Sequence, residues 1–252
     1  MAAPVGEGPE PGPPAPGRRH GRGVTAAVAV LSAACLAAGI AAAGRAHAEL
    51  TRKPTAAELS AAAALGVASR WAREPARQVF PAMLPYHSNL GNPESARRAG
   101  IRPASGCAAA LDPAVAVIAR ADGCRTALRA SYLDQLGGVV YTIGVLAFPA
   151  PGQAAVFLAR AGQDPARGLR AVAFPGTDAA SFDDAARQSA QGRQDGPYAV
   201  LIVAGYADGR PADATGERRD VPFEPAAELA QDVGTPLGQP VTATCQRPEW
   251  SC

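Results

Sequence analysis

An uncharged segment near the amino terminus limits the fold of this chain more than any other feature. Residues 24–44 contain no charged side chain, and ten alanines and six larger aliphatic residues fill most of the run. A helix of this length, rising about 1.5 Å per residue, spans a hydrocarbon core of about 30 Å. Arg18, Arg19 and Arg22 precede the run and favour an amino terminus in the cytoplasm. The sequence therefore predicts a transmembrane helix over 23–44.

Three other interpretations of this segment stay open. Ala46-His47-Ala48 has the small-x-small form of a signal-peptidase site, so cleavage after Ala48 would release a secreted protein. Cys35 would end a lipoprotein signal, although the residues before it lack the usual leucine. A cytosolic protein with a buried alanine-rich helix is the third. The run is longer than the apolar region of about 7–15 residues in a signal peptide, which favours the anchor.

Large apolar residues are concentrated in one part of the chain. Of the 46 Leu, Ile, Val and Phe residues, 24 lie between Leu111 and Ala207. A small core and an extracytoplasmic domain are therefore predicted over 107–207. Residues 1–22 are rich in Pro and Gly and predict a disordered cytoplasmic tail. Residues 208–252 predict a loose carboxyl-terminal tail, and the net charge of +2 argues against nucleic-acid binding driven by charge.

Four cysteines follow the predicted anchor, and an even number of cysteines is typical of an oxidising compartment. Three pairings are possible. We favour Cys107–Cys124 and Cys245–Cys252, because the members of each pair are close in sequence. No close Cys-x-x-Cys spacing occurs, so no metal site and no cofactor are predicted.

Residues 45–106 predict a juxtamembrane helix followed by a Pro-rich linker. Thr55 and Glu58 have the spacing of a capping box at the start of a helix of about 17 residues within 54–74. Five prolines between 75 and 106 predict irregular chain. His87 lies in this linker.

Alternating helical and strand patterns predict an α+β fold for the domain. Asp112 and Pro113 mark the start of a helix, and alternating or continuous apolar runs predict strands. The predicted helices are 113–121, 153–161 and 181–191, and the predicted strands are 124–134, 139–148, 169–174 and 198–206. We expect a mainly antiparallel four-stranded sheet with helices on one face, preceded by the transmembrane helix.

No catalytic signature is present. The sequence contains no Gly-x-Ser-x-Gly elbow, P-loop or Gly-x-Gly-x-x-Gly motif. The candidate site is a polar cluster at a strand end, formed by Tyr206, Asp208 and Arg210. The sequence favours a binding or interaction domain of the cell envelope over an enzyme. An exported hydrolase using carboxylates or His87, or a secreted protein with a structural role in the envelope, is the alternative.

Four segments of the chain also carry a resemblance, which covers about residues 105–211. They are GCAAALDPAVAVIARADGCRTALRASYLD, VVYTIGVLAFP, LRAVAFPGT and GPYAVLIVAGYADGRP. These segments resemble those of actinobacterial single-pass membrane proteins. The resemblance implies a cell-membrane protein with a small extracytoplasmic α+β domain, and it implies no activity, substrate or site residue.

Overall fold

The computed structural model describes residues 22–162, 164, 166–215 and 223–240. Its contacts divide these residues into two units, and the second unit begins at Thr55. The first unit contains one helix, α1 (Arg22–Thr51), which is long and apolar enough to cross a membrane, with a mean hydropathy of 2.2. The predicted span over 23–44 lies within α1. A helix of this kind at the amino terminus is typical of a membrane anchor or a signal sequence.

The second unit is built on one antiparallel sheet of six strands, whereas the sequence predicts four. The order across the sheet is β1-β2-β3-β4-β6-β5. In chain order the strands are β1 (Met83–His87), β2 (Pro93–Ser105), β3 (Thr126–Leu133), β4 (Val139–Ala147), β5 (Ser189–Asp195) and β6 (Tyr198–Tyr206). All neighbouring strands are antiparallel, so the predicted α+β class and the antiparallel pairing are confirmed.

The strands predicted over 124–134, 139–148 and 198–206 form the centre of the sheet as β3, β4 and β6. Every residue of β3 and β4 is buried. Strand β4 pairs along its whole length with β6, from Val139 opposite Tyr206 to Ala147 opposite Tyr198. Runs that are apolar on both faces fit strands that are covered on both sides.

The two strands β1 and β2 arise where the sequence predicts irregular, proline-rich chain. Their prolines occupy positions at which a missing N–H group is tolerated. Pro85 lies in the edge strand β1, and Pro93 is the first residue of β2. Pro103 falls at the register shift between Arg102 and Ser105. The prediction of a linker up to residue 106 is therefore wrong, because edges and bulges accept proline.

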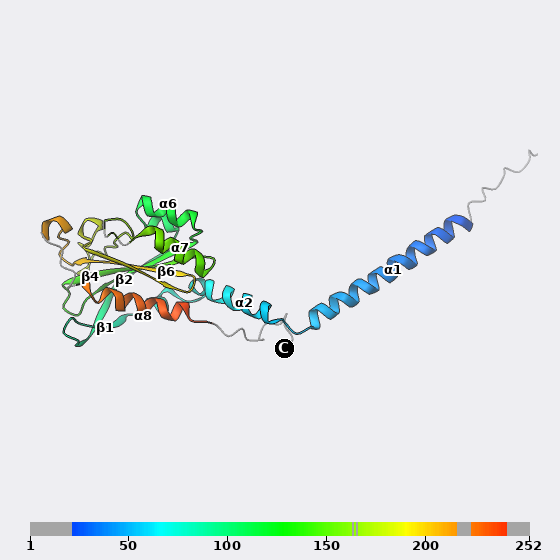
Figure 1. Cartoon of the computed structure of the whole chain (residues 1–252), viewed down its shortest axis with the longest axis horizontal. Helices are drawn as coiled ribbons and strands as arrows, with labels where there is room; N and C mark the ends of the chain where they lie inside the picture. The colour runs from blue at the N-terminus through cyan, green and yellow to red at the C-terminus, as the bar shows by residue number, and fades with distance from the viewer. Residues whose placement is uncertain (1–21, 163, 165, 216–222, 241–252) are drawn as a thin grey trace, which may run out of the picture. The chain divides into compact units, whose positions relative to one another are not determined.

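Helices cover both faces of the sheet, and the predicted placement on one face is wrong (Figure 1). Helices α6 (Pro113–Ala121) and α7 (Pro151–Ala161) lie on one face, and α8 (Ala226–Gly238) lies on the other. Helix α8 contacts both edge strands, β1 and β5, so the sheet curls around it. A hydrophobic cluster lies on each side. We call these sides the α6–α7 face and the α8 face.

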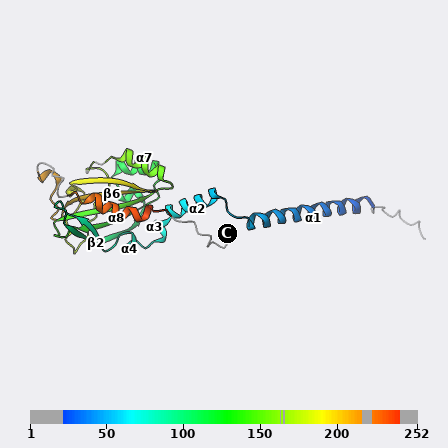
Figure 2. The same ribbon diagram turned by 60° about the horizontal axis from the view of Figure 1, so that its bottom comes forward.

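Helix α8 lies within the segment that the sequence predicts as a loose tail (Figure 2). Its buried apolar residues follow helical spacing and are Ala226, Leu229, Ala230, Val233 and Leu237. Gly234 and Gly238 allow the helix to approach Asp195, and a side chain at either position would collide with that residue. These glycines and Pro236 lower the helix propensity of the segment, so the sequence pattern alone does not predict the helix.

The chain enters the second unit through α2 (Ala56–Ala68), where the predicted capping box is present. The side chain of Thr55 accepts a hydrogen bond from the backbone of Glu58, and the Glu58 carboxylate accepts one from the backbone of Thr55 at 2.7 Å. Two short helices follow α2, namely α3 (Arg70–Arg73) and α4 (Ala76–Val79). A third short helix, α5 (Cys107–Ala110), comes just before α6.

Tyr198, the first residue of β6, fastens α2 to the sheet. Its hydroxyl donates to the carbonyl of Val67 at 2.6 Å and accepts from the backbone N–H of Trp71 at 3.2 Å. The guanidinium of Arg70 also donates to the carbonyls of Leu237 and Gln239 at the end of α8, at 2.7 and 2.9 Å. We call this end of the sheet the α2 end.

Candidate functional site

The end of the sheet opposite α2 is formed by three loop segments, which we call the loop end. They are the β1–β2 turn (88–92), the β3–β4 turn (135–138) and residues 206–210, which begin at the last residue of β6. The strand register brings them together, and Ala207 donates a backbone hydrogen bond to Gly138 at 2.9 Å. In Figure 1 these segments and α2 lie at opposite sides of the second unit.

Hydrogen bonds join the first two turns of the loop end. The Tyr86 hydroxyl donates to the Glu94 carboxylate at 2.5 Å and accepts from the backbone N–H of Gln135 at 3.2 Å. The side-chain oxygen of Gln135 in turn accepts from the backbone of Ser95 at 3.3 Å. Burial raises the pKa of Tyr86 to about 12, so the hydroxyl stays protonated and donates at neutral pH. The two turns are therefore held in a fixed arrangement.

Each of these two turns exposes one leucine. The side chains of Leu90 and Leu136 are each 87% exposed, more than any other large apolar residue in the described chain. Gly91 and Gly137, which follow them, have φ values of +78° and +73° and allow the tight turns. Contiguous exposed apolar patches are a feature of interaction surfaces, whereas single exposed apolar side chains are common on proteins.

The predicted polar cluster of Tyr206, Asp208 and Arg210 forms, and it lies at the loop end. The Arg210 Nε atom donates to both Asp208 oxygens at 3.0 and 2.8 Å, and the guanidinium carbon lies 4.5 Å from the centre of the Tyr206 ring. The Tyr206 ring packs edge-on against Phe223. The hydrogen bond from Arg210 holds the pKa of the Asp208 carboxyl below its usual range. An ionised carboxylate paired in this way is a weak general base.

His87 lies at the end of β1 and contacts α8. Its Nδ1 atom lies 2.9 Å from Glu228 Oε1, and its backbone N–H donates to Glu228 Oε2 at 2.8 Å. That backbone hydrogen bond, followed by the side-chain contact, lowers the pKa of Glu228. The pair connects the first turn of α8 to the edge strand.

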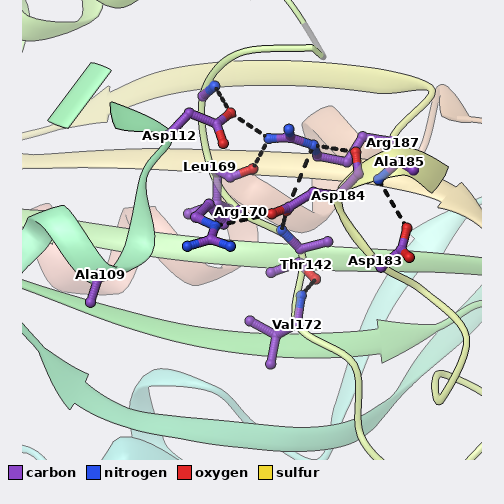
Figure 3. Close-up of polar contacts among 12 residues, drawn as sticks. Ala109, Asp112, Thr142, Leu169, Arg170, Val172, Asp183, Asp184, Ala185 and Arg187 are labelled. Carbon is purple, nitrogen blue, oxygen red and sulfur yellow. Dashed lines mark hydrogen bonds and ion pairs between the residues drawn. The ribbon is translucent and has the colours of Figure 1, made fainter. Parts of the chain in front are cut away.

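A buried polar network on the α6–α7 face is centred on Arg187 (Figure 3). The Arg187 side chain is 5% exposed, and its Nη1 atom contacts the Asp112 carboxylate and the Leu169 carbonyl, both at 2.8 Å. Asp112 also accepts from the backbone of Gly168 at 2.9 Å. The predicted N-cap Asp112 therefore directs its carboxylate to this network and makes no side-chain cap on α6.

The network explains why the strand predicted over 169–174 does not form. Arg170 donates to the Ala110 carbonyl at 2.9 Å, which gives only an isolated bridge, and the next two backbone N–H groups bond to side chains. Ala171 donates to Asp184 at 2.7 Å, and Val172 donates to the Thr142 hydroxyl at 3.2 Å (Figure 3). Leu169 packs against Gly144 of β4, where a side chain would collide with it. The segment thus lies across the sheet rather than within it.

The helix predicted over 181–191 is also wrong. Asp183 caps a single turn (Asp184–Ala186), accepting from the backbone of Ala185 at 2.9 Å, and the chain then extends into β5. The capping residue marks where the turn begins but does not set its length. In the rest of the predicted helix, Arg187 forms a buried ion pair instead, and the residues from Ser189 onward pair with β6 as strand β5.

Cys107 and Cys124 form a disulfide, as predicted, with their Cα atoms 6.3 Å apart. The bond joins α5 to the segment that leads into β3, across α6. Cys245 and Cys252 lie outside the described residues. Cys35 of α1 is a free, exposed thiol.

The described residues contain no cluster of His, Cys, Asp or Glu that could hold a metal ion. Sequence reasoning located the polar cluster but missed the two exposed leucines, because Leu90 and Leu136 sit in short turns without an apolar pattern. It also missed the Arg187 network, whose members come from four separate segments. Comparison of the chain with protein-family models, curated proteins and solved structures gave no match.

Proposed function

We propose that the chain is a membrane-anchored extracytoplasmic protein whose domain binds a partner protein of the cell envelope and does not catalyse a reaction. The main support is the position of Leu90 and Leu136, each 87% exposed, at the end of the sheet opposite α2. The chain enters the domain through α2, so these two leucines lie at the end of the domain that is farther from this entry. Turns that are fixed before binding lower the entropic cost of a contact.

Two features of the chain support the location outside the cytoplasm. The Cys107–Cys124 disulfide is typical of an oxidising compartment. Arg18, Arg19 and Arg22 precede the apolar part of α1, which favours a cytoplasmic amino terminus and an external domain.

The pairing of the carboxylates supports binding rather than catalysis. Asp208 is bound by Arg210, and Asp184 is bound by Arg170 at 3.0 Å. Asp112 is bound by the buried Arg187. For Asp208, the hydrogen bond from Arg210 lowers the pKa of the carboxyl and so reduces the basicity that proton transfer requires.

The contact of His87 with Glu228 favours the alternative, a hydrolase. A carboxylate beside an imidazole is the arrangement that orients a general base. If the protein is a hydrolase, His87→Ala abolishes its hydrolytic activity. If the loop end is a binding surface, His87→Ala leaves partner contact in place.

Site-specific cross-linking in intact cells tests the binding proposal. A photoreactive amino acid at position 136 should give a discrete adduct with one partner, and Leu90→Asp should remove it. The same amino acid at Val156, which is 49% exposed on α7, is the matched control. Identical adducts from both positions, or none from position 136, would contradict the proposal.

A further inference from the structure

Three arginines gather on the α6–α7 face of the sheet. Arg102 of β2 lies directly opposite Arg129 of β3, and opposed residues of antiparallel strands project to the same face. The Nη1 atom of Arg129 donates to the backbone carbonyl of Arg170 at 3.1 Å, which places the backbone of the third arginine beside the pair. Burial lowers the pKa of Arg129, and the charges of Arg102 and Arg170 lower it further.

Positive charge in this cluster exceeds negative charge. Arg129 is 8% exposed, and its second hydrogen bond goes to the Ala109 carbonyl at 3.2 Å. Within the part of the chain that the structure describes, no carboxylate forms an ion pair with Arg129 or Arg102. The nearby acid, Asp184, is bound by Arg170 at 3.0 Å. Three guanidinium groups and one carboxylate leave a surplus of two positive charges. Of the three arginines only Arg129 is buried, and a buried charge without a counterion is costly.

An unsatisfied hydroxyl lies next to these arginines in the strand register. Ser105, at the end of β2, pairs with Ala127, whose side chain belongs to the hydrophobic cluster on the α6–α7 face. The Ser105 Oγ atom is buried and has no hydrogen-bond partner among the described residues. Buried hydroxyls almost always have a partner. The hydroxyl without a partner and the surplus charge therefore lie on the same face of the sheet.

We infer that Arg102, Arg129 and Arg170 form a binding site for a phosphate group. Guanidinium groups bind phosphate oxygens in a bidentate manner. The charge of a phosphate monoester near pH 7, about −1.5 to −2, matches the surplus of the cluster, whereas a carboxylate has one charge. Arg102 is exposed and the Arg170 side chain is 51% exposed, so the site is open to solvent. A soluble phosphate ester and a phospholipid head group share this chemistry.

Thermal unfolding of the full-length protein in detergent tests the site. Inorganic phosphate should raise the midpoint by about 2–4 °C relative to sodium chloride at equal ionic strength and pH, because a ligand that binds only the folded state stabilises it. Acetate should give a smaller rise. Arg102→Gln should lose most of the phosphate effect. Without phosphate, this variant should be at least as stable as the wild type, because repulsion within the cluster is reduced.

Arg125→Gln is the matched control, since Arg125 is exposed and lies just before β3, outside the cluster. It should keep the wild-type response to phosphate. Equal midpoints in phosphate and chloride, an equal rise in acetate, or equal behaviour of the Arg102 and Arg125 variants would overturn the inference. None of these results would change the cross-links from position 136. The phosphate site and the proposed function can therefore be contradicted independently of each other.

Lipid nanodiscs identify the source of the phosphate group. If a phospholipid head group is the ligand, discs with anionic phospholipid should raise the midpoint above that in zwitterionic discs, and Arg102→Gln should remove the difference. If a soluble ester is the ligand, the two discs should give equal midpoints and added inorganic phosphate should still raise both.

Discussion

At the scale of single residues, two buried hydroxyls bind the backbone groups of Val172, which a neighbouring strand would otherwise have bound. The Thr142 hydroxyl accepts from the backbone of Val172 at 3.2 Å and contacts the Ser131 hydroxyl at 2.8 Å. Ser131 in turn donates to the Val172 carbonyl at 2.7 Å. Two hydroxyls in the sheet thus satisfy both backbone groups of Val172.

Replacing Thr142 by valine tests this role. Thr142→Val preserves the shape of the side chain but leaves the backbone N–H of Val172 buried without a partner. We expect the free energy of unfolding in urea to fall by about 1–3 kcal/mol. Thr235→Val, on the exposed face of α8, should change it by no more than about 0.5 kcal/mol. Equal effects of the two variants would contradict the role of the hydroxyl.

Two carboxylates of α8 should respond to pH in opposite ways. The pKa of Glu228 is lowered, so its contribution to stability is present above its usual pKa of 4.5 and is lost as the pH falls through the lower folded value. The pKa of Asp232 is raised by burial and by Glu228, so its ionisation costs stability at neutral pH.

Unfolding of variants of these two residues near pH 7 and near pH 3.5 separates the contributions. Near pH 7, Glu228→Gln should lower the stability and Asp232→Asn should raise it. Glu228→Gln should also reduce the loss of stability on acidification. Changes of the same sign at pH 7 would show that the contact with His87 is not what stabilises α8.

At the scale of elements, close packing of chain segments depends on glycines in the sheet. A side chain at Gly205 of β6 would collide with the backbone carbonyl of Ala186 and lie 2.7 Å from the Phe182 ring. Gly205→Ala should therefore destabilise the domain by about 1–3 kcal/mol in urea unfolding. Gly138→Ala is the control, because no heavy atom lies within 4 Å of the added carbon. A neutral Gly205→Ala would contradict the close approach.

The disulfide should stabilise the segment around α6. Cys107 and Cys124 are separated by 17 residues. Closing a loop of this size contributes about 3 kcal/mol in the loop-entropy description. The double variant Cys107→Ser and Cys124→Ser should lose roughly this free energy of unfolding. Cys35→Ser should be neutral for the domain, and an equal loss in this variant would contradict the assignment.

Sequence patterns predicted the elements whose residues carry local signals. The central strands have long apolar runs, α2 has its capping box, and α6 begins at Asp112 and Pro113. Patterns failed where long-range partners decide the structure. The prolines of β1 and β2 are accepted only because they occupy an edge, a strand start and a bulge. The apolar alternation of 169–174 indicates an extended chain, but Thr142, Ser131 and Arg187 determine that it lies across the sheet.

At the scale of the whole molecule, the sequence predicted the long apolar helix at the amino terminus, the Cys107–Cys124 disulfide and one part of the loop end. Tyr206, Asp208 and Arg210 follow an apolar strand, which is a local signal. Their position at the same end of the sheet as Leu90 and Leu136 depends on the strand register, which no local pattern contains. The tail prediction failed for the same reason, because α8 is stable only against the curled sheet.

Labelling in intact cells tests the central claim, that α1 holds the domain outside the cytoplasm. The full-length chain with Val156→Cys on the exposed side of α7, in a background in which Cys35, Cys245 and Cys252 are replaced by Ser, is treated with a membrane-impermeant maleimide, and the membranes are then isolated. We predict full labelling before permeabilisation, on a membrane-bound chain of full-length mass. Labelling only after permeabilisation, or a labelled chain in the medium that begins at Glu49, would contradict the claim.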